Sequence, residues 1–172
     1  MNIRQAQPSD IQKIAEVHVE SWKSTYRGII SQAYLDDLTV DEQIEKWEER
    51  SLYGTFVAED EEGVFGFASF GKQRDQQFAH YDAELYAIYL IEGKQKTGAG
   101  TALIATGIDY LIEEGFSHML LWVFDRNSAV QFYQKLQPNV VATSQFELAG
   151  DKHDETCFGW ELLMLQKQLT ER

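Results

Sequence analysis

The sequence predicts an α/β protein with a central mixed β-sheet of about six or seven strands and helices on both faces. Three observations indicate this class. Short apolar runs with strand periodicity flank the tight turn 60–63, and such a turn joins antiparallel neighbours. A strand, a glycine-rich turn, a helix and a second strand follow over 84–124, and a βαβ unit of this kind has parallel strands with a right-handed crossover. Helical patterns precede both features and can cover the sheet.

The N-terminal elements can be placed from their periodicity and their caps. Residues 2–7 alternate and predict a short strand. Pro8-Ser9-Asp10 then opens a helix with Ser9 as its N-cap, and Gly28 closes this unit. A shorter helix is expected over 31–38. The capping box Thr39-x-x-Glu42 opens a further helix that ends near residue 50.

Beyond residue 50 the pattern has mostly the period of strands. A polar loop is expected over 72–80, and Gly115 is expected to stop the helix after the glycine-rich turn. The expected strands are 55–59, 64–70, 84–91, 118–124, 140–148 and 156–165, and the expected helices are 98–114 and 127–136.

Composition limits the kind of protein and its partners. The 172 residues have the length of one domain, 1–172, and the net charge of −13 speaks against nucleic acid and anionic membranes as partners. No run approaches the roughly 18 apolar residues of a membrane span. Cys157 is the one cysteine, so a reducing, cytoplasmic location is expected. The histidines have no metal-ligand spacing, so no metal is expected.

The segment Gln95–Thr101 is the strongest candidate for a ligand site. Its glycines let backbone N–H groups converge at a helix N-terminus, whose dipole favours anions. Lys94 and Lys96 add positive charge in an acidic chain. A Walker A loop is excluded because Ala99-Gly100 replace its Lys-Ser/Thr pair, and a dinucleotide loop is disfavoured because Leu103 replaces its third glycine.

Gln95-x-x-Gly98-x-Gly100 resembles the acyl-coenzyme A loop of the GCN5-related N-acetyltransferases, the GNAT superfamily, as small bacterial members have it. Three further segments are similar to that family: the strand 84–90 before the loop, the strand and helix 121–133, and the motif His18-x-x-Ser21-Trp22-x-x-x-Tyr26-x-Gly28. The resemblance covers almost the whole chain. The sequence after Leu136 departs from the Gly-Phe turn of many relatives, which leaves the adjoining wall of the acceptor site open.

The resemblance implies a GNAT-like sheet whose middle parallel strands splay apart to admit the pantetheine of acetyl-coenzyme A (acetyl-CoA), the co-substrate. The main chain of Ile88, Tyr89 and Leu90 would bind the pantetheine and the acetyl carbonyl, as a neighbouring strand would. Asn127 would cap its helix and contact the pantetheine. The pyrophosphate would lie on the backbone of Gln95, Lys96, Thr97, Gly98, Ala99, Gly100 and Thr101.

The same resemblance implies a direct transfer with two catalytic residues. Glu84 would be the general base, working through water, although an ordinary strand-end carboxylate is the alternative. Tyr133 would be the general acid for the departing thiolate, although an aromatic packing residue is the alternative. A phenol has a pKa near 10 and is therefore protonated at neutral pH.

The sequence says less about the acceptor of the acetyl group than about its donor. Trp22 and Tyr26 lie one helical turn apart, and with Tyr34 they could present rings to a cationic amine. The acidic composition favours a small cationic amine. A protein or peptide N-acetyltransferase and a non-catalytic CoA-binding sensor are the alternatives. A homodimer is compatible with the sequence, because the final strand could pair edge to edge with a second copy.

Overall fold

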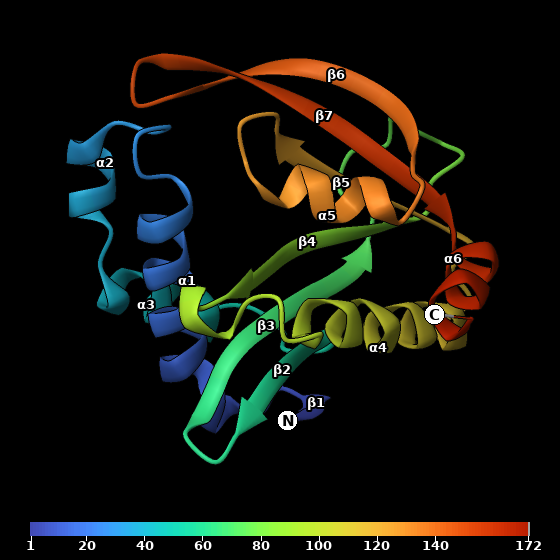
Figure 1. Ribbon diagram of the computed structural model, residues 1–172, viewed down its shortest axis with the longest axis horizontal. Helices are drawn as coiled ribbons and strands as arrows, with labels where there is room; N and C mark the ends of the chain where they lie inside the picture. Colours follow the sequence, from blue (N-terminus) through green and yellow to red (C-terminus); the bar gives the residue numbers. More distant parts are fainter. Residues whose placement is uncertain (172) are drawn as a thin grey trace.

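The computed structural model describes residues 1–171, and it confirms the predicted mixed sheet with helices on both faces (Figure 1). Seven strands follow the order β1-β2-β3-β4-β5-β7-β6. The strands are β1 (Asn2–Gln5), β2 (Thr55–Asp60), β3 (Gly63–Lys72), β4 (Ala83–Leu90), β5 (His118–Phe124), β6 (Asn139–Leu148) and β7 (Asp151–Glu161). The helices are η1 (Pro8–Asp10), α1 (Ile11–Thr25), α2 (Gln32–Asp37), α3 (Val40–Glu48), η2 (Glu92–Lys94), α4 (Ala99–Glu113), α5 (Ala129–Lys135) and α6 (Leu162–Thr170).

The sheet consists of two antiparallel parts that meet at one short parallel pairing. Strands β1 to β4 pair antiparallel, and so do β5, β7 and β6. Between them, β4 and β5 pair only at Ala83 with Met119 and at Glu84 with Leu120. Beyond Glu84 the two strands separate, and this opening is visible between β4 and β5 in Figure 1. We call it the β4–β5 gap.

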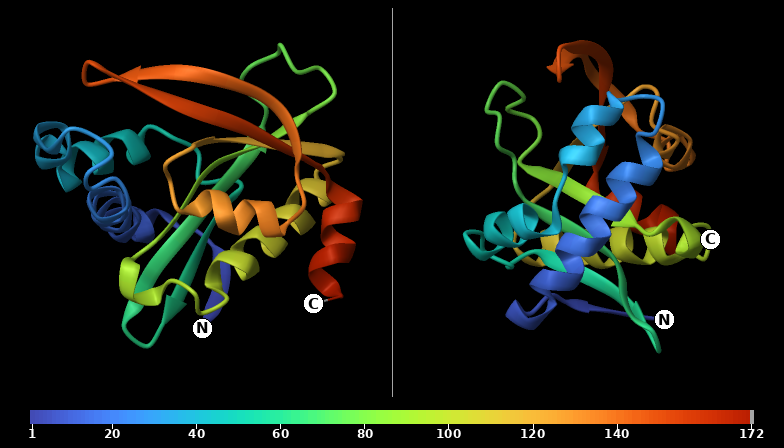
Figure 2. Two further views of the ribbon diagram at one scale, coloured as in Figure 1. Left: turned by 45° about the horizontal axis from the view of Figure 1, so that its top comes forward. Right: turned by 90° about the vertical axis from the view of Figure 1, so that its left-hand side faces the viewer.

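Helices cover the two faces differently. On one face, α1 and α3 pack on the β2–β4 part through a cluster that includes Ile14, Trp47 and Phe67. On the other face, α4 and α5 share the larger core with β3, β5 and β7 (Figure 2). Side chains of β4 therefore alternate between a face that carries α1 and a face that carries α4.

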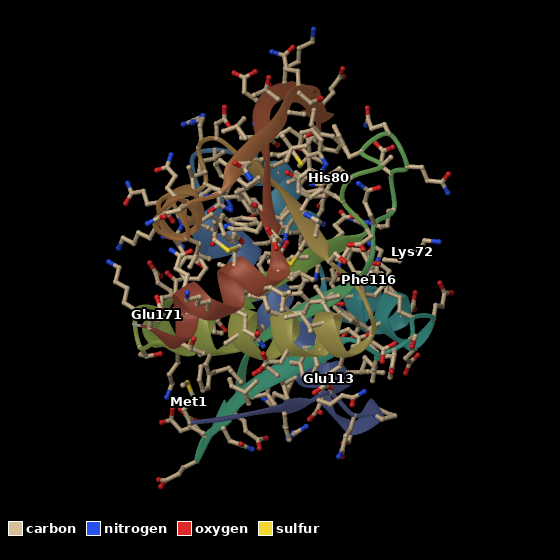
Figure 3. The ribbon with its side chains drawn as sticks, turned by 90° about the vertical axis from the view of Figure 1, so that its right-hand side faces the viewer. Met1, Lys72, His80, Glu113, Phe116 and Glu171 are labelled. Atoms are coloured by element: carbon tan, nitrogen blue, oxygen red, sulfur yellow. The ribbon has the colours of Figure 1, made fainter. Side chains whose placement is uncertain are left out.

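Two local predictions are wrong. Ser9 is not an N-cap, because it lies within η1, where the Asp10 carboxylate accepts the N–H of Gln7 at 2.8 Å. The predicted strand 156–165 ends at Glu161, and α6 follows it. Leu162, Leu165 and Leu169 recur at helical spacing and belong to the core that contains α4, against which α6 packs in Figure 3.

The C-terminal strands also differ from expectation in their position. The segment after residue 150, expected to begin as a loop, belongs to β7 from Asp151 onward. Strand β7 is paired on both sides, by β5 and by β6, so it has no free edge. A second copy could extend the sheet there only through β6, the outer strand.

Candidate functional site

The main chain at the end of β4 has hydrogen-bonding groups that face the gap. Ile91 donates its N–H to the Phe65 carbonyl of β3 at 3.0 Å. Because hydrogen-bonded and non-hydrogen-bonded residues alternate along an antiparallel pair, the main-chain N–H and C=O of Tyr89 also point to β3. Those of Ile88 and Leu90 point to the gap. The Leu90 carbonyl has this orientation, since it accepts from Ser21 Oγ at 3.1 Å and from Gln95 Nε2 at 3.3 Å.

The loop between β4 and α4 presents a run of free N–H groups. Within residues 1–171, no carbonyl or side chain accepts from the backbone N–H groups of 96–101. Lys96 and Gly98 have positive φ angles of 61° and 90°, which turn the chain tightly before α4 begins at Ala99. Solvent-exposed N–H groups at a helix N-terminus form an anion-binding site. The tight turn and the free N–H groups before α4 are the local geometry that the sequence predicts for this segment.

Lys94 does not contribute as the sequence suggested. Its ammonium group pairs with Asp60 at 2.8 Å and with Glu62 at 2.6 Å, both in the β2–β3 turn. These carboxylates raise the pKa of Lys94 and hold its charge away from the N–H groups of the loop. Lys96 is exposed, so it carries the local positive charge of the loop.

The start of α5 connects the far side of the gap to α1. Asn127 Oδ1 accepts the N–H of Ala129 at 2.8 Å, and Asn127 Nδ2 donates to the Tyr26 hydroxyl at 3.0 Å. The N-cap position of α5 is Ser128, one residue later than predicted, but the Asn127 side chain still bonds the first N–H of the helix and also fixes Tyr26. Its side-chain oxygen and nitrogen each make a contact within the protein.

Tyr133 on α5 is buried, with 5% of its surface exposed. Burial and the nearby phenols of Tyr89 and Tyr26 raise its pKa above the ordinary value. Among the described residues, none forms a hydrogen bond with the Tyr133 hydroxyl. The phenols of Tyr26 just after α1, Tyr89 of β4 and Tyr133 of α5 thus lie near one another, and that of Tyr133 is protonated at neutral pH.

Glu84 lies where β4 and β5 part, and its carboxylate is engaged. It is 4% exposed and accepts Arg74 Nη2 at 2.6 Å, Arg74 Nε at 3.2 Å and the Arg74 backbone N–H at 3.0 Å. Arg74 also stacks on Tyr86, with 4.7 Å from its guanidinium carbon to the ring centroid. These three donors and the ion pair hold the Glu84 carboxylate in a fixed position inside the protein.

The aromatic residues predicted for the acceptor lie together. The Trp22 ring centroid is 4.7 Å from that of Tyr26 and 6.4 Å from that of Tyr34. His18 joins them, stacked on Tyr89 at 5.1 Å. Burial, together with the more distant charges of Arg50 and Lys46, lowers the pKa of His18 to about 4. This wall is therefore aromatic and electrically neutral near pH 7.

Two residues of this region were missed from the sequence as site residues. Ser21 is buried and tethers α1 to the Leu90 carbonyl, but a serine within an amphipathic helix gives no signal of this role. Arg74 comes from a polar loop without periodicity, and only the fold brings it to Glu84.

Comparison with known proteins gives the class of this protein. A model of the acetyltransferase (GNAT) family matches residues 14–137, so the chain belongs to this family and is an N-acetyltransferase. The resemblance stated from the sequence is confirmed. The chain is 49% identical over 173 residues to the uncharacterized N-acetyltransferase YuaI of Bacillus subtilis strain 168, covering 100% of this chain and 99% of the relative.

Solved structures share the fold. YncA of Salmonella typhimurium, solved with its cofactor acetyl-CoA, has a TM-score of 0.71 at 24% identity, covering 94% of each chain. The PaiA N-acetyltransferase of Thermoplasma acidophilum, solved with coenzyme A, has a TM-score of 0.67 at 24% identity, covering 90% of this chain and 96% of the other.

Over residues 1–171 no helix is long and apolar enough to cross a membrane. The same residues contain no group of three or more His, Cys, Asp or Glu side chains placed to hold a metal ion.

Proposed function

We propose that this protein transfers the acetyl group of acetyl-CoA to a primary amine, and that the acceptor is a small cationic amine. The β4–β5 gap carries this proposal, because it leaves the main chain of Ile88 and Leu90 without a strand partner next to the free N–H groups of 96–101. The two solved structures compared above contain acetyl-CoA or coenzyme A, which supports this donor.

The chain offers each part of the donor a matching group. The pantetheine amides pair with Ile88 and Leu90 as an added strand. The N–H of Leu90 polarises the acetyl carbonyl as negative charge develops on its oxygen. The pyrophosphate takes the N–H groups at the start of α4, and Asn127 borders the pantetheine.

Two protons move in this reaction. The acceptor enters as an ammonium ion and must lose a proton before its nitrogen can attack, and the departing thiolate must gain one. Tyr133 supplies the second proton. Burial and two neighbouring phenols keep it protonated until it is needed.

Glu84 is the candidate for the general base that the sequence suggests. Its ion pair with Arg74 gives it an alternative, structural role, and the test must separate the two. A base needs a free lone pair, and the three bonds from Arg74 leave one on Glu84 Oε1, which could take a proton through water. Glu84→Gln is expected to lower kcat and to remove the acidic limb of the pH–rate profile, where the rate rises as the base loses its proton. An unchanged profile would assign Glu84 to the structural ion pair with Arg74 alone.

The whole proposal is tested by thiol release. Acetyl-CoA is incubated with the protein and either a panel of small amines, including polyamines and amino sugars, or peptides with free N-termini and lysines. Thiol release with a small amine supports the proposal. Release with peptides alone would make the protein a peptide N-acetyltransferase, and coenzyme A binding without release would make it a sensor.

A further inference from the structure

The side chains of β7 divide cleanly between the two faces of the sheet. Phe158 and Trp160 lie in the core that contains Tyr133, and Trp160 Nε1 donates to the Leu136 carbonyl at 2.9 Å. His153 lies on the opposite face, where its ring stacks on Phe124 of β5 at 5.4 Å. Because strand side chains alternate, Glu155 lies on the same face as His153.

This face continues into the aromatic wall beside the gap. Phe124 is the partner of Glu155 in the β5–β7 register, and its ring is 5.7 Å from that of Tyr26. A pocket of about 420 Å³ opens next to it, lined by Phe124, the neighbouring Asp125 and the first residues of β7. Glu155 therefore lies opposite Phe124, one of the residues that line this pocket.

The carboxylates of this region differ in their partners and in their exposure: Asp151 and Asp154, which line the pocket, are exposed, whereas Glu155 is half-buried. Both Glu84 oxygens accept from Arg74, and Asp125 Oδ1 accepts from the Thr156 hydroxyl at 2.6 Å. The Glu155 carboxylate has neither a hydrogen bond nor an ion pair with any residue of the described range. Arg126 and Lys152 also line the pocket, and within residues 1–171 neither forms an ion pair with a carboxylate.

The surroundings of Glu155 disfavour an uncompensated negative charge. Its side chain is half-buried, and this burial together with Asp125 raises the pKa of its carboxyl group. Cys157 is its neighbour on the same face, and burial, Glu84 and Glu155 raise the pKa of that thiol to about 12. A partly buried carboxylate without a partner gains most from a cation that comes with the ligand.

We propose that Glu155 is a specificity-determining residue that binds the ammonium group of the acceptor. The acceptor is then a diamine or polyamine, with one ammonium at Glu155 and its carbon chain along Phe124 and Tyr26, and a second amine is the one that is acetylated. This inference rests on the proposed function, because it names the substrate class of the same site. It assigns no proton transfer to Glu155.

The test measures amine binding separately from catalysis. The protein is saturated with coenzyme A and titrated in a calorimeter with spermidine, 1,4-diaminobutane and the uncharged 1,4-butanediol. Glu155→Gln keeps the shape of the side chain and removes its charge. Glu147→Gln is the matched control, because it makes the same change at an exposed position of the adjacent β6.

The wild type is expected to bind at least one of the two amines and not the diol. Glu155→Gln is expected to weaken this binding by about tenfold to a hundredfold, as for the loss of a hydrogen bond to a charged group. Glu147→Gln should bind as the wild type does. Equal affinity in the Glu155 variant overturns the inference, and so does a wild type that binds neither amine.

Thiol release with the same amines separates the two proposals. Amine binding that depends on Glu155 without thiol release would leave the inference standing and refute acetyl transfer to these amines. Thiol release with the same acceptor KM in wild type and Glu155→Gln would leave the transfer standing and refute the inference.

Discussion

Replacing Tyr133 with phenylalanine removes one oxygen atom and leaves the ring in the core. No residue of the described chain bonds this hydroxyl, so the free protein loses no hydrogen bond and should not be destabilised. The reaction, however, loses its proton donor. A positioned general acid contributes roughly 10²–10⁴-fold, so kcat should fall at least about a hundredfold, equivalent to about 2.7 kcal/mol of barrier.

The assay is thiol release at saturating acetyl-CoA, combined with calorimetric binding of coenzyme A. Tyr53→Phe is the matched control, because Tyr53 is 59% exposed and donates its hydroxyl to Glu114 at 2.6 Å at the surface. Coenzyme A affinity should be unchanged in both variants. A Tyr133→Phe enzyme with kcat within twofold of the wild type would refute the acid role and leave Tyr133 as a packing residue.

Three further outcomes follow from the described geometry. Gly98→Ala places a methyl group in open space but on a residue with φ 90°, which costs about 1–2 kcal/mol of backbone strain. The KM for acetyl-CoA should therefore rise about tenfold. An unchanged KM would contradict the role of the loop. His18 has a folded pKa of about 4, below its unfolded value of 6.5, so its contribution to stability is complete above pH 6.5 and is lost as the pH falls toward 4. The free energy of unfolding, measured by urea titration, should therefore fall by at most about 3 kcal/mol over this range, and by less in His18→Phe. Gly107→Ala puts a methyl group 2.1 Å from the Phe70 ring in the core, so the melting temperature should fall by about 2–10 °C although alanine favours helices, and a rise would show that the ring can move.

Much of the donor side could be predicted from the sequence, because its determinants are local. Glycines and the strand–loop–helix order are consecutive along the chain, and the positive φ at Gly98 follows from the absence of a Cβ atom. Asn127 was predicted as a cap for the same reason, since a cap acts on the next residues of its own chain. The mixed sheet followed from turn length and right-handed crossover.

The acceptor side depended on contacts between residues far apart in sequence. Arg74 at Glu84, Lys94 at Asp60 and Ser21 at the Leu90 carbonyl are pairings that no periodicity encodes. The helix α6 was read as strand because its apolar run continues that of β7, and only packing against α4 distinguishes the two.

The sequence by itself therefore determined the loop at Gln95–Thr101, its position after a buried strand, and the family resemblance. The tertiary structure alone decided which charges are free. In the folded chain Lys94 and Glu84 form ion pairs, whereas the Glu155 carboxylate has no hydrogen bond or ion pair within residues 1–171. The physical reason is that a charged side chain is neutralised by neighbours in space, whereas glycine turns and caps act through neighbours in the chain.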